Sequence, residues 1–165
     1  MDLTPRSLTS SSIVCFVDGL CEAIHEGELG NPRGIATFGF IIYHNGSLIT
    51  GQLGHIGTGE GMDSVVAEYE ALIHALRYLF EHNLIGEDVE VRNDNQQLYL
   101  EMTGATRPQE VAERPHFDRY KKAGELASHF ADVKYTLIKG PTNEADFLSK
   151  KAYKLVRASL NRRHI

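Results

Sequence analysis

The sequence predicts one α/β domain built on a mixed five-stranded sheet with helices on its faces. Three strand-like segments come first, and an Asn-Gly pair separates the second from the third. The later strand-like segments are separated by helices, so these strands are expected to run parallel to the first through right-handed crossovers. The 165 residues, 42% hydrophobic and 24% charged, are ordinary usage for one globular domain.

The first three segments are expected to form an antiparallel meander. Ile13–Val17 is a short apolar run that ends at an Asp-Gly pair, which predicts a strand followed by a turn. Ile35–Tyr43 is rich in β-branched and aromatic residues, and Asn45-Gly46 separates it from Ser47–Gly54. Asn-Gly between two strand-like runs is the strongest short signal for a hairpin, so the second and third strands should pair.

A glycine-rich connector and a long helix follow the meander. The five glycines between residues 51 and 61 do not follow the GxGxxG spacing, so we interpret them as a flexible loop and not as a dinucleotide site. Ser64–His82 is expected to be a helix that Asp63 or Ser64 can cap. Its apolar stripe comprises Val65, Tyr69, Leu72, Ile73, Leu76, Leu79 and Phe80.

The second half of the chain alternates short strands with helices. The two further strands are expected at Val89–Arg92 and Val133–Lys139. Helices are expected from just after Asp94 to Met102, over His116–Phe130, and from Thr142 or Asn143 to about Leu160, with a polar loop at Thr103–Pro115.

The chain is expected to be organised as one domain between two short tails. Residues 1–12 lack the apolar segment of a secretory signal, and we expect a flexible N-terminal tail there. Residues 13–160 form the domain and residues 161–165 a C-terminal tail. Cys15 and Cys21 do not make a disulfide framework or a four-ligand zinc set. We interpret the two cysteines as reduced thiols of a cytoplasmic protein, and we expect a monomer. No apolar run approaches the ~20 residues of a membrane span, so no membrane association is expected.

Charge is unevenly distributed along the chain. The net charge is −5, with −11 in residues 1–110 and +6 in residues 111–165, and every lysine lies in the final third. This asymmetry permits a basic face beside an acidic site. The alternative is that the lysines are merely solvated side chains on helix surfaces.

Four acidic residues stand at the ends of predicted elements, where ligands gather in an open α/β sheet. Asp18 ends the first strand, Glu68 lies in the opening turns of the long helix, Asp94 follows the fourth strand, and Asp146 opens the last helix. Carboxylates brought together without a partner would be forced to protonate. Oxygen-only ligands suit Mg²⁺ or Mn²⁺. Each acid alone is better explained as a solvated carboxylate at a turn or helix start, so the prediction of a metal site depends on the four acids as a set.

The helical register distinguishes Glu68 from Glu70. At 100° per residue, Glu68 lies at the margin of the buried stripe, beside Val65 and Leu72, whereas Glu70 points further toward solvent. The geometry therefore favours Glu68 as the candidate ligand.

Four motifs, in order and spanning about Ile13 to Ala158, resemble type-1 ribonuclease H, and its archaeal branch in particular. FVDGLCE…NPRGIATFGFIIY resembles the first two strands of that family, and AEYEALIHAL resembles its glutamate helix. VRNDNQQL is similar to its Asp-Ser-Gln turn after a strand, and NEADFLSKKAY to its closing aspartate helix. The resemblance implies a ribonuclease H-like fold.

The resemblance also implies an activity. It implies an endonuclease that hydrolyses the RNA strand of RNA–DNA hybrids to 5′-phosphate and 3′-hydroxyl products with two Mg²⁺ ions, for which Mn²⁺ is a substitute. Asp18 would bridge both ions, Asp146 would help hold the ion that activates water, and Glu68 and Asp94 would hold the other. The 2′-hydroxyl would mark the RNA strand.

Candidate substrate contacts are carried over from the same motifs. They are Gly19, Cys21, Asn31, Gln96 and Lys139. Lys139, or the loop after it, stands where many bacterial members carry a histidine; a surface lysine at a strand end is the alternative.

The chain also departs from the family pattern. It has Asp63-Ser64-Val65 where the family usually has Thr-Asn-Asn before the glutamate helix. Two other hypotheses therefore stand beside the first. One is a nucleic-acid-binding relative with weak or altered cleavage, and the other is a two-metal nuclease acting on double-stranded RNA or on DNA.

Overall fold

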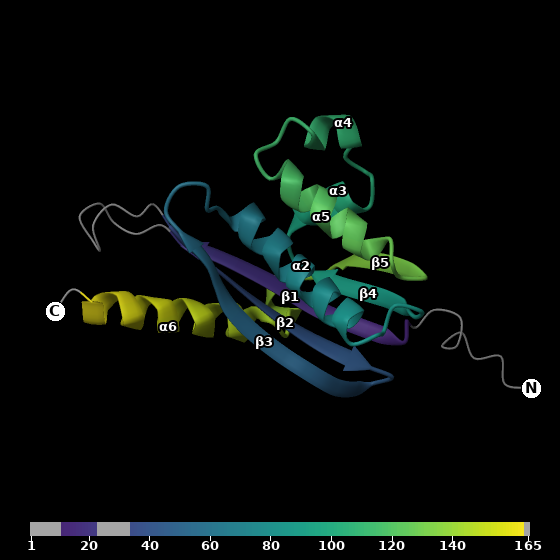
Figure 1. The fold of residues 1–165 in the computed structure, drawn as a ribbon, viewed down its shortest axis with the longest axis horizontal. Helices are drawn as coiled ribbons and strands as arrows, with labels where there is room; N and C mark the ends of the chain where they lie inside the picture. Colours follow the sequence, from purple (N-terminus) through teal and green to yellow (C-terminus); the bar gives the residue numbers. More distant parts are fainter. Residues whose placement is uncertain (1–10, 23–33, 164–165) are drawn as a thin grey trace, which may run out of the picture.

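One mixed five-stranded sheet organises the molecule (Figure 1). The computed structural model describes residues 11–22 and 34–163, so Asn31 and nearly all of the expected N-terminal tail lie outside the described residues. The strand order is β3-β2-β1-β4-β5. β1 is antiparallel to β2 and parallel to β4, and β4 is parallel to β5, which confirms the predicted fold class. None of the helices within the described ranges is long and apolar enough to span a membrane.

The meander consists of β1 (Ile13–Glu22), β2 (Ile35–His44) and β3 (Ser47–Thr58). The predicted hairpin is confirmed, because β2 and β3 pair directly across Asn45-Gly46. Asn45 has φ 51° and Gly46 has φ 82°. Both residues thus adopt the left-handed conformation that a tight two-residue hairpin turn requires.

Two of the expected element ends are wrong, and both strands run further. β1 continues through the Asp-Gly pair, since Asp18 pairs with Gly39 and Cys21 with Ala36. β3 was expected to end at Gly54 but continues to Thr58, and so includes Gly57, which we had expected in the connecting loop. Long-range pairing with β2 overrides the local turn preference of both segments.

Two helices pack on the sheet, and each of them comes close to the backbone of a strand at a glycine. A Cβ on Gly19 would lie 2.2 Å from the Ala67 carbonyl carbon of α2 (Ser64–Glu81). A Cβ on Gly39 would lie 2.5 Å from Leu148 Cβ of α6 (Asp146–Arg163). Neighbouring residues of a strand point to opposite faces, and Gly19 pairs with Phe38, the neighbour of Gly39. α2 and α6 therefore cover opposite faces.

The long helix matches its predicted range, and Asp63 is its cap. The Asp63 side chain accepts a hydrogen bond of 2.8 Å from the backbone N–H of Val66. Most of the predicted stripe lies in the main core, where Tyr69, Leu72 and Leu76 pack against the sheet. Phe80 is an exception, because 42% of its surface remains exposed at the end of the helix.

The rest of the chain confirms two strands and corrects two boundaries. The region expected to be a polar loop contains α4, a short helix that begins at Pro108 and buries Val111 completely. The last helix begins at Asp146 and not at 142 or 143. The Asn143 side chain instead donates a hydrogen bond to Val17 O and accepts one from the backbone N–H of Ala145. The remaining elements are β4 (Asp88–Asn93), α3 (Gln96–Met102), α5 (Phe117–Ala127), β5 (Asp132–Leu137) and the 3₁₀ turn η1 (Gly140–Thr142).

Candidate active site

Three carboxylates converge where the central strands of the sheet separate. β1 and β4 pair only as far as Phe16 and Arg92. Asp18 lies just beyond this point on β1, and Asp94 follows the end of β4. Together with Glu68 of α2, each offers a carboxylate oxygen, and these oxygens all lie within 4.8 Å of one another. The cluster thus forms at the reversal point of the strand order, where an open α/β sheet forms a crevice.

Asp18 is the most central of the three. Its side chain is 5% exposed, and Ser149 Oγ of α6 donates a hydrogen bond of 2.5 Å to Asp18 Oδ2. Burial, together with the charges of Asp94 and Asp146, raises the pKa of Asp18 from 3.8 to about 7, although the Ser149 hydrogen bond works in the opposite direction. Without a cation, Asp18 therefore stays mostly protonated in the folded protein until the pH approaches 7.

Glu68 approaches the cluster from α2. It is 4% exposed, and Asn93 Nδ2 at the end of β4 donates a hydrogen bond of 3.1 Å to Glu68 Oε2. Burial and the charges of Asp18 and Asp94 raise the pKa of Glu68 well above its ordinary value. A hydrogen bond from the Gly19 backbone opposes this shift only in part.

Glu70 lies on a different side of α2. Arg119 Nε of α5 donates a hydrogen bond of 2.9 Å to Glu70 Oε1, and His74 Nδ1 lies 3.5 Å from the other oxygen. We expected Glu70 to point to solvent; it instead joins α2 to α5. The structure places Glu68, and not Glu70, with the other carboxylates.

Asp94 and Asp146 occupy the more open side of the site. Burial, together with the charge of Asp146, raises the pKa of Asp94, while a hydrogen bond from Asn143 lowers it. Asp146 lies outside the three-carboxylate cluster, and its Oδ2 lies 2.8 Å from Lys150 Nζ one turn along α6. Asp146 is nevertheless near enough to act electrostatically on both Asp18 and Asp94.

The chemistry of this cluster fits a divalent cation. Three acidic side chains with raised pKa values face one another, and a bound cation would offset both the repulsion and the cost of burying their charge. The ligand atoms are all carboxylate oxygens, which suit hard cations better than the softer transition metals. The geometry therefore supports divalent metal use.

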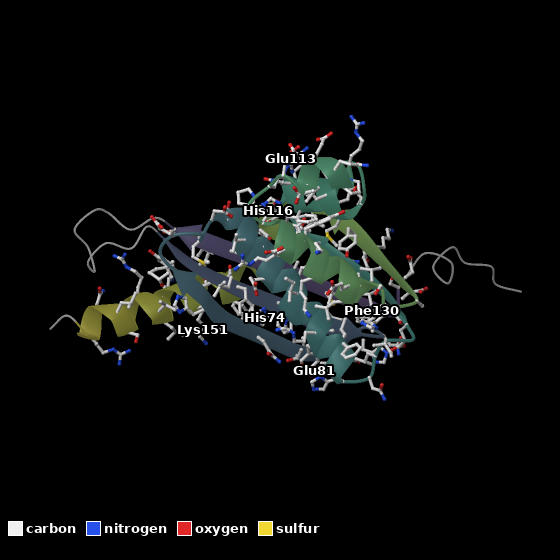
Figure 2. The ribbon with its side chains drawn as sticks, turned by 45° about the horizontal axis from the view of Figure 1, so that its top comes forward. His74, Glu81, Glu113, His116, Phe130 and Lys151 are labelled. Atoms are coloured by element: carbon white, nitrogen blue, oxygen red, sulfur yellow. The ribbon has the colours of Figure 1, made fainter. Side chains whose placement is uncertain are left out.

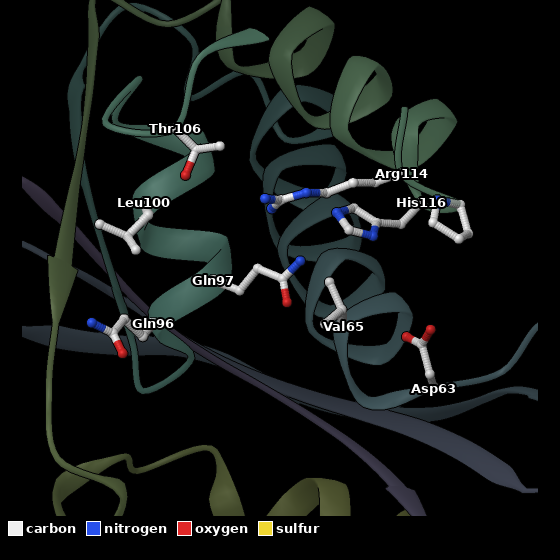
Figure 3. A pocket seen from close by; sticks show the side chains of 9 residues that line it. Asp63, Val65, Gln96, Gln97, Leu100, Thr106, Arg114 and His116 are labelled. Carbon is white, nitrogen blue, oxygen red and sulfur yellow. The ribbon is translucent and has the colours of Figure 1, made fainter. Parts of the chain in front are cut away.

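A cavity of about 610 Å³ opens between the starts of α2 and α3 (Figure 3). Asp63, Gln96, Arg114 and His116 are among its lining residues. None of the three clustered carboxylates lines this cavity, but Gln96 is two residues beyond Asp94 and Val65 is one helical turn before Glu68. Asp63 already caps α2; the acid that departs from the family pattern therefore has a structural partner.

A buried polar network lies behind Arg114 and His116 of this cavity, and it was not predicted from the sequence. Glu101 is fully buried and accepts hydrogen bonds from Tyr69 Oη at 2.6 Å and from Arg114. His116 Nε2 lies 2.8 Å from Glu101 Oε1. Burial acts to raise the pKa of Glu101, but its Tyr69, His116 and Arg114 partners lower it below the ordinary value. The only sequence signal was an acid three residues after Leu98, on the buried face of a short helix.

The other predicted contact residues are spread around the cluster. Gly19 packs against α2, Cys21 is half-buried in β1, and Gln96 is exposed at the first turn of α3. Lys139 is exposed just before η1.

Comparisons with known proteins agree with this geometry. A family model described as "Reverse transcriptase-like" matches residues 25–152. The N-terminal RNase H domain of a Mycobacterium tuberculosis protein is 25% identical with TM-score 0.73, covering 91% of this chain and 99% of that one. RNase H1 from the halophilic archaeon Halobacterium salinarum is 27% identical with TM-score 0.66, covering 86% and 97%. LC11-RNase H1 from compost, solved in complex with an RNA/DNA hybrid, is 27% identical with TM-score 0.69, covering 87% and 98%.

Proposed function

Because this chain belongs to the reverse transcriptase-like family and has the fold of type-1 ribonucleases H, we propose that it is a ribonuclease H. It hydrolyses the RNA strand of RNA–DNA hybrids to products with 5′-phosphate and 3′-hydroxyl ends. The observation that carries the proposal is the convergence of the Asp18, Glu68 and Asp94 carboxylates at the strand reversal. A similar protein bound to an RNA/DNA hybrid supports the choice of substrate.

The four acids would together hold two Mg²⁺ ions. Asp18 would be shared between them, Glu68 and Asp94 would serve one ion with it, and Asp146, which acts electrostatically on Asp18, would help hold the other. When bound, such ions supply a nucleophilic water at neutral pH and stabilise the leaving oxygen. Ser149 and Asn93 hold the Asp18 and Glu68 carboxylates in place, so that little reorganisation is required during catalysis.

Residues of the neighbouring cavity would contribute to selection of the substrate. The exposed Gln96 amide suits a sugar edge, and Arg114, which also pairs with Glu101, would supply positive charge for a phosphate. The 2′-hydroxyl of RNA is both donor and acceptor and can be read by such groups. The proposed function thus requires the RNA strand of the hybrid to lie across the carboxylates.

The test uses end-labelled RNA–DNA, RNA–RNA and DNA–DNA duplexes, each with Mg²⁺, Mn²⁺ or EDTA. We expect cleavage of the RNA–DNA duplex alone, dependent on the metal. Preferential cleavage of RNA–RNA or DNA–DNA would contradict the assigned substrate.

A matched pair of variants tests the site itself. Glu68→Gln removes a cluster carboxylate and should lower kcat by at least ~100-fold, since one preorganised charge contributes several kcal/mol in such a site. Glu70→Gln, two residues away and paired with Arg119, should retain nearly normal cleavage. Equal activity of the two variants would remove Glu68 from the active site.

A further inference from the structure

The last helix, α6, has two distinct faces. Leu148, Ser149 and Ala152 are buried against the sheet, and α6 packs on β1, β2 and β3. Between residues 146 and 163 the helix carries six basic residues and a single acid. The inner face of α6 is therefore buried against the sheet, and its basic residues lie on the remaining surface.

The outer face of α6 combines an aromatic residue with lysines. Phe147 is 61% exposed, and Lys150, Lys151 and Lys154 are exposed as well. These residues are spaced three or four apart, so their side chains share one side of the helix. Figure 2 shows Lys151 on α6, well separated from His116 in the layer of α2 and α5. We name Phe147, Lys150, Lys151 and Lys154 the α6 outer face.

This face begins next to Asp146, on the open side of the candidate active site. Phe147 directly follows Asp146, and Lys150 Nζ lies 2.8 Å from Asp146 Oδ2. The charge of Lys150 also acts on Asp18, where it helps to lower the pKa. A nucleic-acid strand bound at the carboxylates could therefore continue along the lysines of α6.

We propose that the α6 outer face binds the sugar–phosphate backbone of the nucleic acid flanking the cleaved bond, with Phe147 packed on a base or sugar. The inference rests on the proposed function. Lysines neutralise phosphates, and an aromatic ring among them offers a stacking surface that any base can use. Residues 1–110 carry a charge of −11, so a polyanion is repelled by much of the remaining molecule.

A lipid surface fits this face less well than a nucleic acid. A membrane-bound amphipathic helix buries its apolar face in lipid, but the apolar face of α6 is already occupied by the sheet. Outside that contact, the described part of α6 exposes two large apolar residues, Phe147 and Leu155. Two such side chains provide little area for insertion but are sufficient for stacking.

The test measures binding of an RNA–DNA hybrid in Ca²⁺ over a salt series. The variants are Phe147→Ala and the double variant Lys151→Ala/Lys154→Ala. Lys134→Ala on β5, another exposed lysine, is the charge control, and its effect is compared per lysine removed. The double variant should reduce the slope of log affinity against log salt by about 1.8, at about 0.9 per phosphate contact. Phe147→Ala should weaken binding roughly tenfold with an unchanged slope, as expected for lost stacking.

The outcomes separate this inference from the proposed function. If both α6 variants bound the hybrid with wild-type affinity and wild-type salt slope, the inference about the α6 outer face would be overturned, whether or not the protein cleaves hybrids. Hybrid binding that depends on α6 without any cleavage would sustain it and refute the proposed activity. If Lys134→Ala reduced hybrid affinity and the salt slope as much per lysine removed, the inference would also be overturned, because the effect would then be one of net charge. Binding of the wild type to vesicles of anionic phosphatidylserine, lost in Phe147→Ala while hybrid binding persists, would assign the face to lipid instead.

Discussion

Asp18→Asn should stabilise the metal-free protein at neutral and alkaline pH. In the folded chain the Asp18 carboxyl is buried beside Glu68 and Asp94, and its pKa is raised to about 7 by burial and by the neighbouring charges of Asp94 and Asp146. An asparagine has nearly the same shape, and its oxygen can still accept the hydrogen bond from Ser149. The substitution therefore removes a costly charge and little packing.

The sign and size of the effect follow from proton linkage. Between pH 3.8 and about 7, folded Asp18 keeps a proton that the unfolded chain has released. The free energy of unfolding of the wild type therefore falls as pH rises through this window and levels off above it. A shift of this size corresponds to about 4 kcal/mol. The gain of Asp18→Asn over wild type should be near zero at pH 4 and approach that value above pH 7.

The assay is urea unfolding of both proteins in EDTA from pH 4 to pH 8.5. Glu113→Gln, a change at an exposed carboxylate, provides the control and should follow the wild type throughout. The comparison also cancels the titration of the eight histidines that all three proteins share. With excess Mg²⁺ the wild type should gain stability by mass action and the difference should narrow.

The reasoning fails if Asp18→Asn is less stable than wild type at pH 8 in EDTA, or if its advantage does not change between pH 4 and pH 8. Either result would mean that the buried carboxylate is not destabilised by its surroundings. Loss of hybrid cleavage in a variant that is more stable would separate the role of Asp18 in catalysis from any role in folding.

Two further substitutions test the supports of the site by urea unfolding. Glu101→Gln should lower stability by about 1.5–3 kcal/mol, because charge-assisted hydrogen bonds with Arg114 and His116 are lost. The folded pKa of Glu101 is lowered, so this difference should shrink as pH falls through that pKa; a constant difference would contradict the network. Gly19→Ala should cost at least about 1–3 kcal/mol, because its Cβ would overlap the α2 backbone; wild-type stability would contradict the close approach.

The sequence was informative where a signal is local. Asn45-Gly46 identified the hairpin because a two-residue turn with positive φ selects those residues. The register of one helix distinguished Glu68 from Glu70, since a difference of two residues rotates the side chain by about 200°. Asp18 and Asp94 were found because both follow apolar strand segments that prove to be parallel neighbours.

The features that the sequence did not predict depend on distant partners. Glu101 is an ordinary acid in a short helix until Tyr69, Arg114 and His116 surround it. An Asp-Gly pair normally favours a turn, and only the facing strand and the helix above it keep Asp18 within β1. Likewise, Asp146 occupies the expected helix start, but it pairs with Lys150 and lies outside the three-carboxylate cluster.

The glycines at 19 and 39 link the fold to the chemistry. Gly19 lets the backbone of α2 approach β1 near Glu68, and Gly39 lets α6 approach the opposite face near Ser149. Asp18 lies between these contacts, adjacent to Gly19 in sequence and paired with Gly39 across the ladder. Larger side chains at either position would move a helix outward, and with it Glu68 or the hydroxyl that holds Asp18. The cluster of carboxylates is thus positioned by the absence of side chains beside it.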